Sequence, residues 1–280
     1  MRESSLPQVV ALGLVLFFVL GIFLQSLNVV FGAWFVQVFV FFCIPWVSCR
    51  LWGQAPSRAL GFWAVSLKKL AAGALLGAVC YFAVVLPLMY WVKQVVPASW
   101  EKVFGGRTPF ADLGGIELWL MVVLVVLAAP LCEEVFFRGF IQPKLIQRWG
   151  APLGLLVTSV LFSFIHVDPI GFLARLALGV LFGWLAYAGA SLWVSVLAHV
   201  SYNLLVYLIY VWVSYGGDEP STELSFLGPG ILFLWLALGT GSMVALLWVL
   251  GFSPKPTKAS DSETAQACTL SMVQPRAKKP

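Results

Sequence analysis

The sequence predicts an all-α protein: a polytopic bundle of about eight transmembrane helices that encloses a buried polar cavity. Two observations lead to this prediction. The chain is 61% hydrophobic and only 10% charged, a composition far from that of soluble domains. Several apolar runs also reach the roughly 20 residues that a helix needs to cross the hydrocarbon core. Because a water-soluble domain could not bury so much apolar surface, we expect the chain to be integral to a membrane.

Breaks at glycine, proline and charged residues divide the apolar stretches into eight expected spans. These are residues 8–25, 29–49, 67–92, 116–147, 153–167, 170–187, 191–213 and 229–251. The fourth span is too long for one vertical crossing, so we expect it to tilt or to extend into water. Asp168 and Pro169 indicate a tight reversal between the short fifth and sixth spans. Merging or splitting those two would invert the topology of everything that follows.

The distribution of basic residues predicts that both termini lie in the cytoplasm, with the protein in the cell (inner) membrane. Lysine and arginine gather in segments 50–69 and 144–150, whereas the 214–228 loop is acidic. The loop near 93–115 departs from this pattern, since it carries basic residues on the expected outer side. The net charge of +5 is expected to meet anionic lipid. No phosphate loop or nucleotide fingerprint occurs, so neither nucleic acid nor nucleotide is an expected partner.

Three regions follow from this organisation. Residues 1–110 are expected to form transmembrane helices that carry no motif, the first of them a retained anchor because no cleavage pattern follows it. Residues 111–252 are expected to form the catalytic core. Residues 253–280 are polar and lack periodicity, which predicts a disordered basic tail in the cytoplasm.

The chain has one acidic pair inside an apolar segment, Glu133 and Glu134. Glu134 precedes Arg138 by four residues, which favours an ion pair within one helix. Glu133 has Phe137 at the equivalent position, so its partner must come from another helix. A carboxylate there suits a general base. The alternative is a pair of acids solvated at the end of a helix, near the cytoplasmic side.

Both histidines of the chain also lie in apolar stretches. His166 follows Phe162 by four residues, and alone it could simply bond a backbone carbonyl or Asp168. His199 precedes Asn203 by four residues, which puts two hydrogen-bond donors on one stripe, as an oxyanion requires. Interhelical hydrogen bonding that holds the bundle together is the alternative for that pair. Titratable groups that persist in hydrocarbon tend to mark functional sites, and the combination favours an active site.

Taken in order, the three patterns resemble the motifs of the CPBP intramembrane proteases, a family that includes type II CAAX prenyl endopeptidases and bacteriocin-processing or immunity relatives. The motifs are Glu133-Glu134-x-x-x-Arg138, Phe162-x-x-x-His166 and His199-x-x-x-Asn203. The resemblance covers roughly residues 115–210. It implies that Glu133 and His166 hold and activate a water molecule, and that His199 and Asn203 stabilise the oxyanion. Glu134, Arg138 and Phe162 are then the supporting residues.

The resemblance leaves metal dependence open, because the family has been discussed both as metalloproteases and as glutamate proteases. Glu133, His166 and His199 are the ligands expected if zinc binds. However, His-Glu-x-x-His is missing, and an asparagine beside His199 suits an oxyanion site better. We therefore favour water activation without a metal, and expect no other cofactor.

The predicted function is cleavage of a membrane-associated protein or peptide within the bilayer. One alternative is a proton-coupled transporter, whose polar residues would be spread over both halves of the chain. Another is a non-catalytic immunity or scaffold relative. Among the remaining polar residues, Arg175 is expected to pair with Asp168 or to reach the interface, and Gln37 to lie at a turn or to mediate helix contacts. Cys132 is expected to fill the core.

Overall fold

The structure is a computed structural model that describes residues 6–97, 99–100, 110, 113–216 and 228–252. Every regular element in these residues is a helix. Seven helical segments are long and apolar enough to cross a membrane, and an eighth apolar helix, Ala151–Phe164, is shorter. The prediction of a polytopic all-α bundle with about eight spans is therefore confirmed. The predicted tail, residues 253–280, lies outside the described residues.

Most long segments alternate between α-helical and π-helical stretches. In chain order the elements are α1 (Leu6–Val15), η2 (Leu16–Gly21), α2 (Ile22–Leu27), α3 (Val29–Phe35), η3 (Val36–Cys43), α4 (Ile44–Leu51), α5 (Pro56–Ala59), α6 (Leu67–Cys80), η4 (Tyr81–Val85), α7 (Leu86–Val95), α9 (Gly115–Val123), η5 (Leu124–Ala128), α10 (Ala129–Glu134), η6 (Val135–Ile141), α11 (Gln142–Trp149), α12 (Ala151–Phe164), α13 (Phe172–Gly189), α14 (Leu192–Ser214) and α15 (Pro229–Val249).

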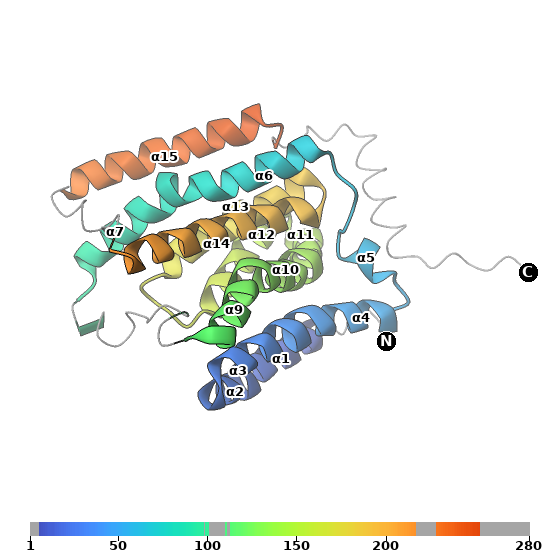
Figure 1. The fold of residues 1–280 in the computed structure, drawn as a ribbon. Helices are drawn as coiled ribbons and strands as arrows, with labels where there is room; N and C mark the ends of the chain where they lie inside the picture. Colours follow the sequence, from blue (N-terminus) through green and yellow to red (C-terminus); the bar gives the residue numbers. More distant parts are fainter. Residues whose placement is uncertain (1–5, 98, 101–109, 111–112, 217–227, 253–280) are drawn as a thin grey trace, which may run out of the picture.

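The fourth apolar segment is one continuous helix of 35 residues, Gly115–Trp149, which agrees with its predicted excess length. The fifth and sixth are separate helices, because the chain turns at residues 165–171 between α12 and α13. Figure 1 shows the first two segments, α1 to α4, along one side of the bundle and α6 with α15 along the other. The helices from α9 to α14 lie between these two layers.

Asn28 turns the chain between the first two segments. Its backbone is extended, and its side chain accepts a hydrogen bond of 2.8 Å from the Phe31 amide at the start of α3, the usual way in which an asparagine caps a helix. The two helices then approach closely, since a Cβ atom on Gly32 would lie 2.3 Å from the Gln25 nitrogen. Because of this turn and this close approach, the two segments form an antiparallel hairpin, which packs against the central helices.

Glycines also bring α6 against α14. A Cβ atom on Gly77 would lie 2.0 Å from the carbonyl oxygen of Ala198, and one on Gly73 would lie 2.8 Å from that of Val194. Glycine at contacts between membrane helices permits such backbone approach. The segment of α14 that carries His199 is therefore held directly against the α6 backbone.

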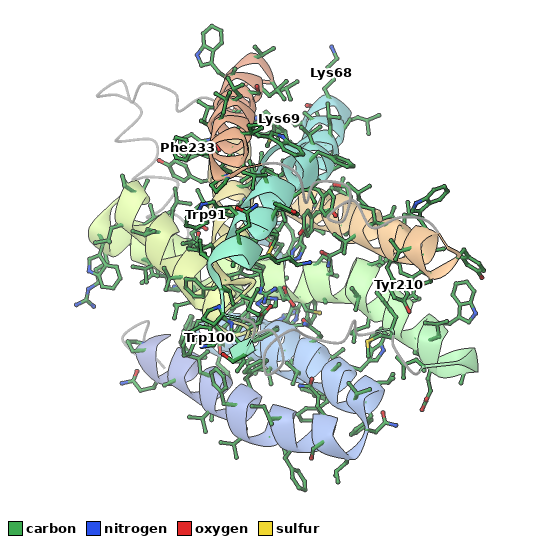
Figure 2. The ribbon with its side chains drawn as sticks, turned by 90° about the vertical axis from the view of Figure 1, so that its left-hand side faces the viewer. Lys68, Lys69, Trp91, Trp100, Tyr210 and Phe233 are labelled. Carbon is green, nitrogen blue, oxygen red and sulfur yellow. The ribbon has the colours of Figure 1, made fainter. Side chains whose placement is uncertain are left out.

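Both ends of the bundle carry exposed tryptophans, and one of them also carries a pair of lysines. The end where α6 begins carries Lys68 and Lys69, whereas Trp91 lies in α7, toward the other end of the same segment (Figure 2). Exposed tryptophans lie at that second end, near the last turns of α7 and α14 and the first turn of α9: Trp91, Trp100, Trp119 and Trp212. Others lie at the first end, near the starts of α6 and α14 and the ends of α11 and α15: Trp63, Trp149, Trp193 and Trp248. Aromatic residues at such positions are typical of the boundary between membrane and water.

Candidate active site

Glu134, Arg138 and His199 form a buried ionic cluster. Glu134 Oε1 lies 2.9 Å from Arg138 Nη1 and 3.1 Å from His199 Nδ1. The side chains of Glu134 and Arg138 are both 0% exposed, so the pair neutralises charges that hydrocarbon would not tolerate singly. The ion pair within one helix, predicted from spacing, is present. Its contact with His199 was not predicted, because Glu134 had been paired only with Arg138.

Glu133 faces the other side of the His199 ring. Its Oε2 lies 3.9 Å from His199 Nε2, a separation beyond a direct hydrogen bond. Its Oε1 accepts a hydrogen bond of 2.8 Å from Gln37 Nε2 in η3. Glu133 therefore does find its partners on other helices, as predicted. One of them is a histidine, and the other is a glutamine that had been assigned to helix contacts.

The Phe162 ring is the common neighbour of the three predicted motifs. Its centroid lies 5.2 Å from that of the His166 ring and 5.8 Å from that of the His199 ring, both edge to face. The Arg138 guanidinium carbon lies 4.3 Å above the same ring, close enough for a cation–π attraction. The His199 ring also stacks on the Phe182 ring of α13, with 4.6 Å between the two ring centroids. The side chain of Phe162 thus holds the histidines and the arginine in one cluster.

His166 lies at the edge of this cluster, just beyond the end of α12. Its Nδ1 lies 2.8 Å from the carbonyl oxygen of Phe162, which is the backbone bond that had been considered as its alternative role. Among the described residues no hydrogen bond or ion pair joins His166 to Glu133. The next residue, Val167, has φ of +51°, an unfavourable conformation for a β-branched side chain. Beyond it, Arg175 pairs with Asp168, as predicted.

Asn203 lies one turn beyond His199 on α14. Its Nδ2 donates a hydrogen bond of 2.7 Å to the carbonyl oxygen of Val125 in η5. An amide nitrogen carries two hydrogens, so this bond orients the group and leaves a second N–H. The interhelical bond considered for Asn203 is therefore present, and it remains compatible with a donor role.

Two side chains fix α13 against η6 and α11. Arg138 Nη2 donates to the carbonyl oxygen of Gly179 at 3.2 Å, and Gln142 Nε2 donates to that of Gly183 at 3.0 Å. Donors and acceptors are each four residues apart, so the two bonds form successive rungs one turn from each other. A Cβ atom on Gly183 would lie 2.7 Å from Gln142 Oε1, so a larger residue there would displace the Gln142 amide from this bond.

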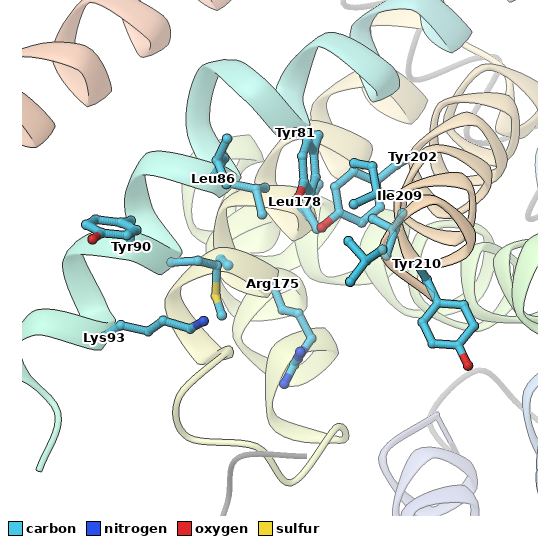
Figure 3. A pocket seen from close by; sticks show the side chains of 14 residues that line it. Tyr81, Leu86, Tyr90, Lys93, Arg175, Leu178, Tyr202, Ile209 and Tyr210 are labelled. Carbon is cyan, nitrogen blue, oxygen red and sulfur yellow. The ribbon is translucent and has the colours of Figure 1, made fainter. Parts of the chain in front are cut away.

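A pocket of about 360 Å³ opens beside the cluster, between α7, α13 and α14. Its lining includes Leu178, one turn from Phe182, and Tyr202, one turn from His199. In Figure 3 the Tyr81 and Tyr202 rings lie near Leu178, and the Lys93 and Arg175 side chains lie on the lower side of the pocket. The pocket is mainly apolar, with cations at one side.

The residues present do not fit a zinc site. In the described part of the chain, no three histidine, cysteine, aspartate or glutamate side chains gather as metal ligands would. This includes Glu133, His166 and His199, the set expected if zinc bound. Cys132, next to Glu133 in the sequence, is buried in a hydrophobic cluster, as predicted.

Sequence reasoning missed Gln37 as part of the site. The available signal was a glutamine inside an apolar span, which indicates a hydrogen bond to another helix but does not say to which residue. Its partner is 96 residues away in sequence, so no local spacing could have identified the contact.

Comparisons with known proteins agree with the motifs. Residues 115–205, which include all three, match the family model of type II CAAX prenyl endopeptidases described as Rce1-like. A Bacillus subtilis (strain 168) protein named "Putative membrane peptidase YdiL" is 29% identical over 90 residues. That match covers 32% of this chain and 37% of the relative, so only about a third of either protein is aligned. No solved structure matches the chain. Over residues 115–205 the chain is thus similar to type II CAAX prenyl endopeptidases and to a putative membrane peptidase, in agreement with the resemblance to the CPBP family carried by its three motifs.

Proposed function

We propose that this protein is an intramembrane endopeptidase that hydrolyses a peptide bond of a membrane-associated protein or peptide. The observation that carries the proposal is the gap between Glu133 Oε2 and His199 Nε2, 3.9 Å across. Both groups are buried, and each is held from behind, Glu133 by Gln37 and His199 by Glu134. A base and a hydrogen-bond donor that converge in this way can act on a water molecule and on the carbonyl that it attacks.

In the proposed mechanism Glu133 takes a proton from a water molecule that His166 helps to orient. The resulting hydroxide attacks the carbonyl carbon of the scissile bond, and the charge that develops on oxygen is stabilised by His199 and Asn203. Glu133 then delivers the proton to the amide nitrogen as the carbon–nitrogen bond breaks, which yields a carboxylic acid and an amine. No step needs a metal ion, and the donor geometry does not favour one.

The Glu134 carboxylate sets which nitrogen of His199 can serve in this scheme. Because Nδ1 lies 3.1 Å from that carboxylate, it carries a proton and donates it, as is usual for a histidine beside an acid. Nε2 is therefore the nitrogen available to a substrate oxygen, and it must also be protonated to stabilise an oxyanion. Arg138, by pairing with Glu134, balances the charge in this buried cluster.

The pocket lined by Tyr202 is the proposed binding site for the substrate. It lies within one turn of His199 along α14 and is lined mainly by apolar side chains, so it suits apolar residues next to the scissile bond. Lys93 on one side favours an acidic group at the end of that segment, whereas Arg175 is already paired with Asp168. The basic end of the bundle, with Lys68 and Lys69, is proposed to face the cytoplasm of a cell whose inner membrane holds the protein.

The test is a comparison of peptide termini in membrane and secreted fractions by mass spectrometry. Cells that lack the gene are complemented with the wild-type chain or with Glu133→Gln, which removes the proposed base and keeps the shape. We expect a set of new termini with the wild type that disappears with Glu133→Gln, at equal amounts of inserted protein. Identical termini in the two strains would contradict the proposal.

A further inference from the structure

The Glu133 carboxylate is held by a side chain from outside the segment that the family model matches. Gln37 lies in η3, in the second transmembrane segment, and its Nε2 donates a hydrogen bond of 2.8 Å to Glu133 Oε1. The matched segment begins only at residue 115. The helical hairpin at the start of the chain, which carries no recognised motif, therefore contacts the group assigned as the general base.

This bond determines how the Glu133 carboxylate is turned. Rotation about its last torsion is broad and roughly two-fold, so a partner is needed to fix which oxygen faces which neighbour. With Oε1 bound to Gln37, the other oxygen, Oε2, is the one that lies 3.9 Å from His199 Nε2. The orientation required of a base that shares a substrate with His199 thus depends on the amide of Gln37.

The oxygen atom of the Gln37 amide gives independent support. Gln37 Oε1 is buried and has no hydrogen-bond partner in the described part of the chain. Buried acceptors are rarely left so, and turning the amide over would place that oxygen against a carboxylate, where two acceptors repel. The Gln37 amide is therefore oriented by its bond to Glu133, and its oxygen is left without a hydrogen bond. A glutamine that served only to join helices would be expected to satisfy both ends.

We propose that Gln37 is a positioning residue of the active site, whose amide N–H sets the orientation of the Glu133 carboxylate toward the scissile bond. This inference rests on the proposed function, since it concerns the same site. It means that the catalytic centre is built from the N-terminal hairpin as well as from the family core.

Two substitutions remove the contact in different ways. Gln37→Met keeps the length of the side chain without any hydrogen-bonding group, and Gln37→Asn keeps the amide but is one methylene too short to reach. The matched control is Gln25→Met. Gln25 lies in the same hairpin and donates only to the carbonyl of Gly21, at 3.3 Å within its own helix.

The first measurement needs no substrate. Infrared spectra of the purified full-length protein in detergent are recorded, and the Glu133 carboxyl band is identified by subtracting the Glu133→Gln spectrum. We expect this band to shift in Gln37→Met and in Gln37→Asn, and to keep its wild-type position in Gln25→Met. A band that stays unshifted in both Gln37 variants would overturn the proposal.

The second measurement uses a fluorogenic peptide built around a bond that the membrane comparison identifies as cleaved. We expect both Gln37 variants to lower kcat by about 10–100-fold, the usual effect of misplacing a catalytic group, with KM changed less than twofold. Wild-type kcat in these variants, with Glu133→Gln inactive, would refute the role of Gln37 and leave the proposed function standing. Full activity of Glu133→Gln would instead refute the proposed function.

Discussion

The stability of the ionic cluster can be tested by replacing its most buried member, Glu134, with glutamine. Arg138 would then remain in a site where its side chain is 0% exposed, with the carbonyl of Gly179 and the Phe162 ring as its remaining partners. Breaking a buried ion pair by removing one partner costs about 3–5 kcal/mol. Glutamine retains one acceptor oxygen, so we expect the free energy of unfolding to fall by about 3 kcal/mol, the lower end of this range.

Glu133→Gln is the matched comparison, because it makes the same exchange of one carboxylate oxygen for an amide NH2 group in the neighbouring residue. Glu133 has no arginine partner, and glutamine in its place keeps an oxygen that can accept the hydrogen bond from Gln37, so we expect this substitution to cost only about 1 kcal/mol. The difference of about 2 kcal/mol corresponds to a midpoint roughly 4–8 °C lower for Glu134→Gln, measured by thermal unfolding in detergent. Equal midpoints for the two variants would refute the assignment of Glu134 to support.

A double-mutant cycle isolates the ion pair from other effects of the substitution. When Arg138→Gln is combined with Glu134→Gln, no unpaired charge remains, so the double variant should be less destabilised than the sum of the two single variants. Residues in one ionic network couple by about 0.5–3 kcal/mol. Additive losses would show that the two side chains act separately, despite the 2.9 Å between them.

The remaining predictions concern activity and packing. Glu133→Gln and His166→Ala should each abolish cleavage of a membrane reporter while the protein still inserts; wild-type rates in either would contradict the mechanism. Activity should survive stringent chelation, because the donor set does not gather as metal ligands would; loss of activity with rescue by zinc would show otherwise. Gly77→Ala should destabilise the protein by about 1–3 kcal/mol, since its Cβ would meet the Ala198 carbonyl, whereas Gly241→Ala, with open space around it, should not. Val206→Trp, which narrows the pocket, should raise KM more than it lowers kcat, and an unchanged KM would remove the pocket from substrate binding.

Much of the fold could be predicted, because a membrane sets the length of each element. The eight predicted spans correspond to the seven long apolar helices and the shorter α12. Contacts within one helix were equally accessible, since fixed geometry places Glu134 and Arg138 side by side. The prediction of a separate reversal between α12 and α13 also agrees with the structure.

Contacts between distant segments were less accessible. Nothing in the local pattern of η3 says that Gln37 would face Glu133, because the rotation of one transmembrane helix against another depends on packing. The same holds for His199, whose Nδ1 lies against Glu134, although spacing had suggested only its shared stripe with Asn203. The predicted catalytic roles of these residues remain proposals to be tested by the substitutions above.

The paired bonds from Arg138 and Gln142 to α13 restrict how the protein can open for a substrate. Sliding α13 along η6 and α11 by even one residue would break both bonds together. The two bonds therefore favour movements in which these helices keep their mutual arrangement. The peripheral helices, such as the first segment and α15, are then better placed to open for an incoming peptide. In each of these two helices only 11% of the most apolar 18 residues is buried. The ionic cluster, besides balancing charge, thus helps to hold the central helices in one arrangement.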